Sequence, residues 1–315
     1  MGKCLITKLN GSVNNSELLK IGELRINFGK VQNPTKENRS LNIKVNKESK
    51  VELVGNGYFT DENLGTNKGK SLLLSPNTDN YIYISNNDVA ISISDKYALT
   101  GIFHQAVVYP WNASGDKSHI KYNLEDLKYS AALTNLSVKS ANISGDISAL
   151  TNLTALVTMD LSKTQVSGDI ANLKTLTALT SMNLSNMQNP LTGNISNLKS
   201  LTKCTDIKLD YSKLTGDLAT LPASCRFVSF YKDKGSTFTW TTRSSSAKII
   251  AIASDAALTN IDKMLQDQAQ CQVGFSSSND VWLKTISVTG NRTSASDDAV
   301  ATLQQKGYTI SINKS

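Results

Sequence analysis

The residues with the clearest capacity for chemistry are acidic or amide side chains that recur inside a four-residue phrase. The phrase Ser/Thr-Gly-Asp/Asn-Ile/Leu places them at Asp146, Asp169, Asn194 and Asp217, which are 23, 25 and 23 positions apart. Carboxylates at regular spacing could bind calcium, but Ca²⁺ takes roughly six to eight oxygen ligands and each repeat supplies one such side chain. Glycine permits a tight turn, and Asp or Asn can bond its own backbone there. We therefore interpret the phrase as a structural turn and predict no metal site.

Other catalytic side chains are sparse in the chain. The two histidines, His104 and His119, have no sequence-local Cys, Asp or Glu partner. No nucleophile elbow, Walker loop or dinucleotide fingerprint is present. We predict no catalytic residues, no cofactor and no enzymatic activity. A glycan-acting enzyme with an unmarked active site is the alternative.

The four cysteines show neither a CxxC pair nor another metal-ligand spacing. They are Cys4, Cys204, Cys225 and Cys271. Cys204 occupies an apolar position of a repeat, which predicts a buried free thiol. A Cys204–Cys225 bridge between neighbouring coils is the alternative.

The turn phrase belongs to a longer repeat whose copies cover residues 133–150, 156–173, 179–198 and 204–221. A period in the twenties is typical of a solenoid. The copies resemble leucine-rich repeats, L-x-x-L-x-L-x-x-N-x-L, with first apolar positions at Leu133, Leu156, Leu179 and Cys204. The usual Asn is replaced by Ala141, Thr164, Met187 and Ser212. Backbone groups at that turn need other partners, so we expect coils less regular than those of the family.

The array is predicted to continue to the C-terminus. Strands are expected at 227–230, 249–252, 284–288 and 309–312. Helical spacing at 260–270, with Asn260 as a cap, predicts one helix. A capping-box pattern at Ser294 and Asp297, with Gly307 as terminator, predicts a second.

The first hundred residues have a different pattern. Apolar residues alternate in 41–45, 51–53 and 89–93, and turn signals separate these runs. We predict a β-rich chain with an N-terminal antiparallel β-sandwich-like domain at 1–105. A junction and solenoid cap follow at 106–130, and a leucine-rich-repeat-like β/α solenoid with an α/β C-terminal end occupies 131–315.

The residues that flank the inward pair of each repeat strand are predicted to form a concave binding face. They are Asn135, Ser137, Lys139, Thr158, Asp160, Ser162, Ser181, Asn183, Ser185, Asp206, Lys208 and Asp210. The first three rows are small and polar and lack the Trp, Tyr or Arg of a protein-binding hot spot. They suit a glycan or a large shallow contact, or they are simply solvated.

The net charge of +7 and pI near 9.1 would suit a polyanionic partner. The lysines are scattered and form no basic stripe, so we predict no nucleic-acid binding. The N-terminus has no apolar signal-peptide core, and no apolar run approaches the ~20 residues of a membrane helix. We therefore expect no Sec signal peptide and no membrane span.

Both ends of the chain carry a further resemblance. The opening MGKCLITKLNGSVNNSELLKIGELRINF resembles the start of virion proteins from crAss-like phages that infect Bacteroides. The tail KTISVTGNRTSASDDAVATLQQKGYTISI resembles the ends of repeat proteins in Bacteroidota and their phages. The resemblance implies a head- or tail-associated fibre or decoration protein, assembled in the host cytoplasm and present in the virion. Residues 1–105 would dock on other virion proteins, in a homotrimer for example, and the repeats would face a host-surface glycan or protein. A secreted or surface bacterial leucine-rich-repeat adhesin is the rival.

Overall fold

Alternating apolar residues in the first third of the chain form β-strands. The computed structural model describes residues 24–28, 40–54, 59–60, 67–84, 89–95, 98–103, 120–138, 142–232, 235–275 and 284–313. Its N-terminal strands are β1 (Leu24–Phe28), β2 (Ser40–Val45), β3 (Ser49–Val54), β4 (Phe59–Thr60), β5 (Ser71–Leu74), β6 (Asn80–Ile84), β7 (Val89–Ile93) and β8 (Leu99–Phe103). The predicted strands at 41–45, 51–53 and 89–93 are thereby confirmed.

These strands pair antiparallel in two groups, ordered β1-β7-β3-β5 and β8-β2-β6-β4. Ile43 and Ile102 from one group, and Val51 and Ile91 from the other, are fully buried in a shared apolar core. Both groups continue into the repeats, because β8 pairs parallel with β10 and β9 (Ile120–Asn123) bridges β1 and β11. The expected boundaries at 105 and 130 stay a prediction.

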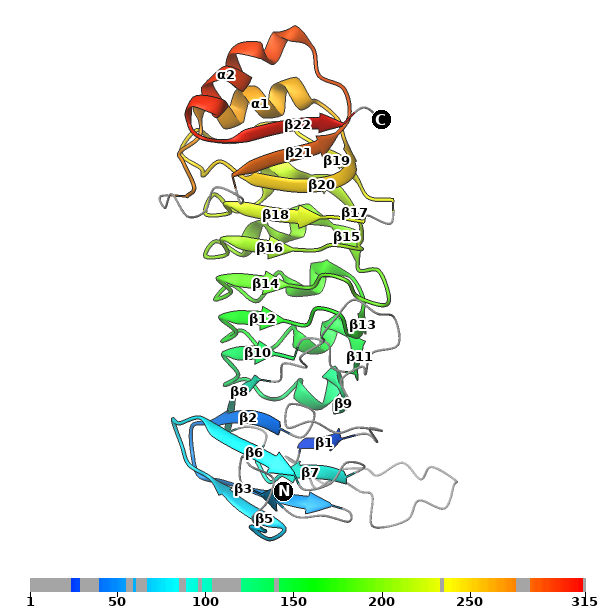
Figure 1. The fold of residues 1–315 in the computed structure, drawn as a ribbon, viewed down its shortest axis with the longest axis vertical. Coiled ribbons are helices and arrows are strands. Elements are labelled where there is room, and N and C mark those ends of the chain that lie inside the picture. The colour runs from blue at the N-terminus through cyan, green and yellow to red at the C-terminus, as the bar shows by residue number, and fades with distance from the viewer. Residues whose placement is uncertain are drawn as a thin grey trace, which may run out of the picture.

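Each repeat forms one coil of a first strand, a second strand and a short 3₁₀ helix (Figure 1). The first strands are β10 (Asn135–Ser137), β12 (Thr158–Asp160), β14 (Ser181–Asn183), β16 (Asp206–Lys208) and β18 (Phe227–Phe230). The second strands are β11 (Asn142–Asp146), β13 (Gln165–Ser167), β15 (Thr192–Asn194), β17 (Lys213–Asp217) and β19 (Thr237–Thr239). The helices are η3 (Leu124–Leu127), η4 (Ile147–Leu150), η5 (Ile170–Leu173), η6 (Ile195–Ser200) and η7 (Leu218–Thr220). The segment expected to cap the array thus supplies η3, which lies against η4.

The first strands stack in parallel and in register, which aligns their central apolar side chains into one row. Leu136, Met159, Met182, Ile207 and Val228 follow one another across the sheet and are almost completely buried. Because a coil buries this row only against its neighbours, the array is stabilised by stacking rather than by any single coil.

The turn phrase starts each 3₁₀ helix. The side chains of Asp146, Asp169, Asn194 and Asp217 each accept a hydrogen bond from the backbone N–H two residues later, at 2.7–2.9 Å. The preceding glycines have φ between 111° and 121°, a region that disfavours other residues. The phrase is therefore a helix cap joined to a left-handed turn, as the structural interpretation predicts.

The first strands stack in register despite the missing Asn of the repeat pattern, whereas the second strands are interrupted: β13 and β15 belong to different sheets, joined by a single bridge between Asp169 and Thr192. That the coils are less regular than those of leucine-rich repeats stays a prediction. After each first strand a non-glycine residue takes a positive φ, as at Lys163, Asn186 and Tyr211. The N–H of each then donates to a backbone carbonyl of the next coil at 2.9–3.0 Å. The next coil thus satisfies the groups that the side-chain amide would have bonded.

The C-terminal part adds longer elements to the same sheet. They are β20 (Ala251–Leu258), α1 (Ile261–Gln270), β21 (Thr285–Thr289), α2 (Asp297–Gln305) and β22 (Thr309–Asn313). The predicted strands and helices are confirmed, with Gly307 at φ 85° after α2. The predicted caps are wrong: Asn260 donates to the Trp240 carbonyl, and Thr293 rather than Ser294 caps the 3₁₀ turn η9 (Ser294–Ser296) before α2.

A buried polar cluster joins the repeats to this C-terminal part. The Trp240 indole and the Arg243 backbone N–H both donate to Asp267 Oδ2, at 2.9 and 3.1 Å. The Arg243 guanidinium, in a residue only 5% exposed, donates to the carbonyls of Ala219, Leu221, Pro222 and Lys248. Three of these carbonyls, those of Ala219, Leu221 and Pro222, belong to the chain at and just after η7, so the Arg243 guanidinium satisfies buried acceptors at the end of the last repeat.

Candidate binding face

The outward residues of the first strands form two rows across the sheet. One row runs Asn135, Thr158, Ser181, Asp206, and the other runs Ser137, Asp160, Asn183, Lys208. Neighbouring parallel strands lie ~4.8 Å apart, so each row presents polar groups at that interval. We call these eight residues the polar strand face.

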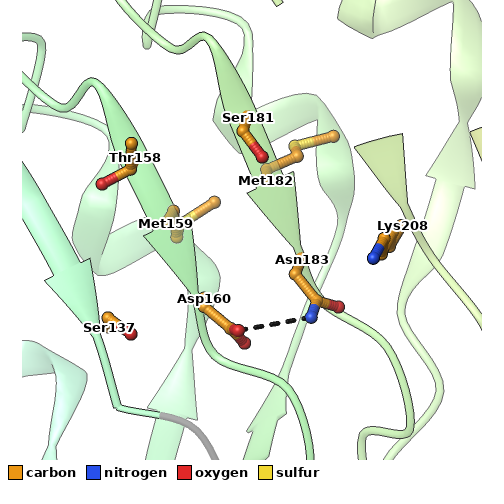
Figure 2. Close-up of a pocket in the computed structure, with 8 residues that line it drawn as sticks. All are labelled: Ser137, Thr158, Met159, Asp160, Ser181, Met182, Asn183 and Lys208. Carbon is orange, nitrogen blue, oxygen red and sulfur yellow. Dashed lines mark hydrogen bonds between the residues drawn. The ribbon is translucent and has the colours of Figure 1, made fainter. Parts of the chain in front are cut away.

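A shallow hollow of ≈ 230 Å³ lies over the middle of the polar strand face (Figure 2). Its lining residues are Ser137, Thr158, Met159, Asp160, Ser181, Met182, Asn183 and Lys208. They come from four consecutive first strands, so the coil stacking itself builds the hollow.

Several polar groups of this face already bond one another. Asn135 Nδ2 donates to Thr158 Oγ1 at 2.7 Å, and Asn183 Nδ2 donates to Asp160 Oδ2 at 3.3 Å (Figure 2). Within the described part of the chain, the hydroxyls of Ser137 and Ser181 and the ammonium of Lys208 have no hydrogen-bond partner. These three groups are therefore available to a ligand, while the bonded amides and carboxylate fix the shape of the face.

Not all predicted face residues share this surface. Ser162 and Ser185 are buried, at 3% and 4% exposed, because the chain turns inward after the strand. Asp210 lies at the same turn, where its carboxylate accepts from the Tyr231 N–H at 2.9 Å. Lys139 lies outside the described residues. In each coil the first two predicted positions therefore lie on the polar strand face, whereas Ser162 and Ser185 do not. That these residues bind a partner stays a prediction.

Sequence reasoning missed the row contributed by β18. Arg226 forms an ion pair with Asp206 at 3.2 Å and lies over the Phe275 ring at 4.9 Å. Phe227 follows in the first row, with Lys208 Nζ 6.0 Å from its ring centre. The strand predicted at 227–230 could have revealed this row, because in-register stacking of that strand on β16 puts Phe227 beside Asp206. The polar strand face therefore borders on an aromatic and a cation.

The buried thiols offer no reactive site. Cys204, Cys225 and Cys271 are free and buried, which confirms the expected state of Cys204 and excludes the bridge to Cys225 in this structure. Burial raises the pKa of both the Cys204 and the Cys225 thiol to about 12. Cys4, His104 and His119 lie outside the described residues.

Among the residues that the structure describes between 24 and 313, no three His, Cys, Asp or Glu side chains are grouped so that they could hold a metal ion. None of the helices described is long and apolar enough to cross a membrane.

No family model matches the chain, and no curated protein matches it. Solved structures of leucine-rich-repeat proteins do match it in fold. The ectodomain of the receptor kinase GASSHO1/SCHENGEN3 from Arabidopsis thaliana, in complex with CASPARIAN STRIP INTEGRITY FACTOR 2, is 19% identical with a TM-score of 0.39. That match covers 62% of this chain and 23% of the receptor chain. Internalin C2 from Listeria monocytogenes is 15% identical with a TM-score of 0.38, covering 70% of this chain and 83% of the internalin.

These TM-scores are below 0.5, so the fold assignment rests on the coils of this chain alone. Parallel in-register first strands, a buried apolar row and one short helix per coil define a β-rich, leucine-rich-repeat-like solenoid.

Proposed function

We propose that this chain is a non-catalytic binding protein and that its polar strand face binds a surface glycan or a protein. The observation that carries the proposal is the hollow over β10 to β16, in which Ser137, Ser181 and Lys208 offer unbonded polar groups. A face assembled from four coils is rigid before it meets its partner, which lowers the entropy lost on binding.

Substitutions that fill the hollow test this proposal. Ser181 is half-buried in the hollow, so Ser181→Trp places a bulky ring there. Exposed Thr202 lies between η6 and β16 and does not line the hollow, so Thr202→Trp is the matched control. The probes are intact Bacteroides cells and a glycan array. We expect wild type and Thr202→Trp to bind equally and Ser181→Trp to lose at least tenfold in affinity. Equal binding by all three proteins would contradict a role for this face.

We further propose that the chain is a virion protein of the fibre or decoration type. The N-terminal strands would form the sandwich-like attachment domain and dock on other virion proteins, leaving the repeats outward. The resemblance of both chain ends to virion and repeat proteins supports this placement. Mass spectrometry of purified virions tests it: absence from the particle, or a secretion signal encoded upstream, would favour the surface adhesin instead.

A further inference from the structure

The last strand of the long sheet has an open edge. In the described part of the chain, β22 pairs with β21 alone. Thr309 N–H donates to the Lys284 carbonyl and Gly290 N–H donates to the Asn313 carbonyl, both at 2.8 Å. Because backbone groups alternate in direction along a strand, Ser311 also bonds toward β21. The N–H and C=O groups of Ile310 and Ile312 therefore point to the open edge.

The apolar row of the solenoid is incompletely covered at this edge. Ile310 and Ile312 continue the row of Ile286 and Val288, which are 0% and 1% exposed, yet both are only half-buried. A hollow of ≈ 400 Å³ lies beside them. Its lining residues are Gly290, Asn291, Arg292, Val300, Gln304, Ile310 and Ile312. An open strand edge next to half-covered isoleucines favours the addition of a further strand.

The sequence of β22 is complementary to itself. In an antiparallel pair of two copies centred on Ser311, Ile310 of one copy faces Ile312 of the other, and Thr309 faces Asn313. The residues that exchange backbone hydrogen bonds in this register are the isoleucines, whose N–H and C=O groups already face the edge. A two-fold axis perpendicular to the sheet also keeps the isoleucine side chains of both copies on the same face.

We propose that two copies of this chain associate through their β22 edges and form one continuous sheet across a two-fold axis. No proline or charged residue lies between Thr309 and Asn313, so the usual protections of an edge strand are missing. Pairing bonds the free backbone groups and covers the isoleucines beside the hollow. The proposal does not depend on what the polar strand face binds.

The two-fold axis makes a charge-swap experiment possible. Ser311 is exposed, and in the proposed register it meets its own copy with the Cα atoms ~4.5 Å apart. We expect Ser311→Lys and Ser311→Glu each to weaken dimerisation about fivefold at low salt, since like charges directly opposite are unfavourable. A mixture of the two variants should form heterodimers at least as well as wild type. Thr202→Lys, the same charge change at a distant exposed site, should leave dimerisation unchanged.

The measurement is sedimentation equilibrium of the full chain over a range of concentrations, with each variant checked by circular dichroism. A concentration-dependent dimer that responds in this way supports the proposal. A monomer at every concentration, a trimer, or no rescue on mixing overturns it. Ile310→Pro supplies a second variant, because it removes an N–H that β21 does not use. It should abolish the dimer; a dimer that persists also overturns the proposal.

Discussion

The carboxylate of Asp146 lies directly beneath Gly168 of the following coil, where a Cβ would come within 2.7 Å of Asp146 Oδ2. The same relationship joins Asn123 to Gly145, Asp169 to Gly193 and Asn194 to Gly216. The residue that caps one coil's helix thus removes the space for a side chain in the next coil. The Asp or Asn of the phrase is needed to cap the helix of its own coil, and the Gly is needed because the cap of the preceding coil leaves no space for a Cβ.

Gly168→Ala should destabilise the protein for two reasons. The backbone at 168 has a φ of 121°, and the added methyl group meets the Asp146 carboxylate. Gly235 has a φ of 97° with open space around its Cβ, so Gly235→Ala isolates the backbone effect. That effect alone is about 1–2 kcal/mol. Urea unfolding should show a larger loss for Gly168→Ala than for Gly235→Ala. Asp146→Ala alone loses the bond from the Ser148 N–H, so it serves as a second background in which Gly168→Ala should cost less than it does in wild type. Equal losses in the two glycine variants would contradict the steric contact.

Asp169 should act as a cap and not as a metal ligand. Asp169→Ala loses the bond to the Ala171 N–H and should cost about 0.5–2 kcal/mol of stability. Asp169→Asn should stay close to wild type, because Asn194 makes the same bond one coil later. Thermal unfolding with added Ca²⁺ and with EDTA checks this. A Tm that rises with Ca²⁺ in wild type and not in Asp169→Asn would show that the carboxylate binds the ion.

The Cys204 and Cys225 thiols should be unreactive in the native protein. Burial raises the pKa of each to about 12, so neither forms the nucleophilic thiolate at pH 8. A thiol-reactive chromophore should therefore modify them only after denaturant is added. These raised pKa values also mean that folded-state stability falls as the pH rises above the ordinary thiol value of 9.0. Rapid labelling of either thiol in native buffer would refute the burial.

Asp267 should contribute pH-dependent stability at the C-terminal end. Burial acts to raise its pKa, but donors on Lys263, Trp240 and the Arg243 backbone outweigh burial and hold the pKa below the ordinary 3.8. The contribution is therefore present above pH 3.8 and is lost as the pH falls through the lowered value. Asp267→Asn should be less stable than wild type at pH 7 and should lose less on acidification. Parallel stability curves for the two proteins between pH 6 and 2.5 would contradict this assignment.

Much of the solenoid could be predicted from sequence because its signal is repeated. Leu133, Leu156, Leu179 and Cys204 mark the start of each coil, and all four are fully buried. The turn phrase predicted a structural role for Asp146 and Asp169, and the hydrogen bonds agree with it. Apolar spacing also placed α1 and α2, and Gly307 marked the end of α2.

The remaining features depend on contacts between coils that no single repeat encodes. Ser162 and Ser185 follow the outward spacing of a strand, but the strand ends at the preceding row and the chain turns inward. Arg226 and Phe227 join the face only through the register of β16 with β18. The Arg243 guanidinium caps carbonyls more than twenty residues earlier in the chain, a pairing without a local sequence signal.

The strands of the solenoid lie across its long axis, so the hydrogen bonds between coils run along that axis (Figure 1). A force that pulls the two ends of the array apart therefore acts along these hydrogen bonds, and each pair of neighbouring coils carries the same load. The hydrogen bonds between one pair of coils can break without those of the next pair, because every coil contacts only its neighbours. Under tension the array should lengthen stepwise, as an extensible tether that dissipates work coil by coil.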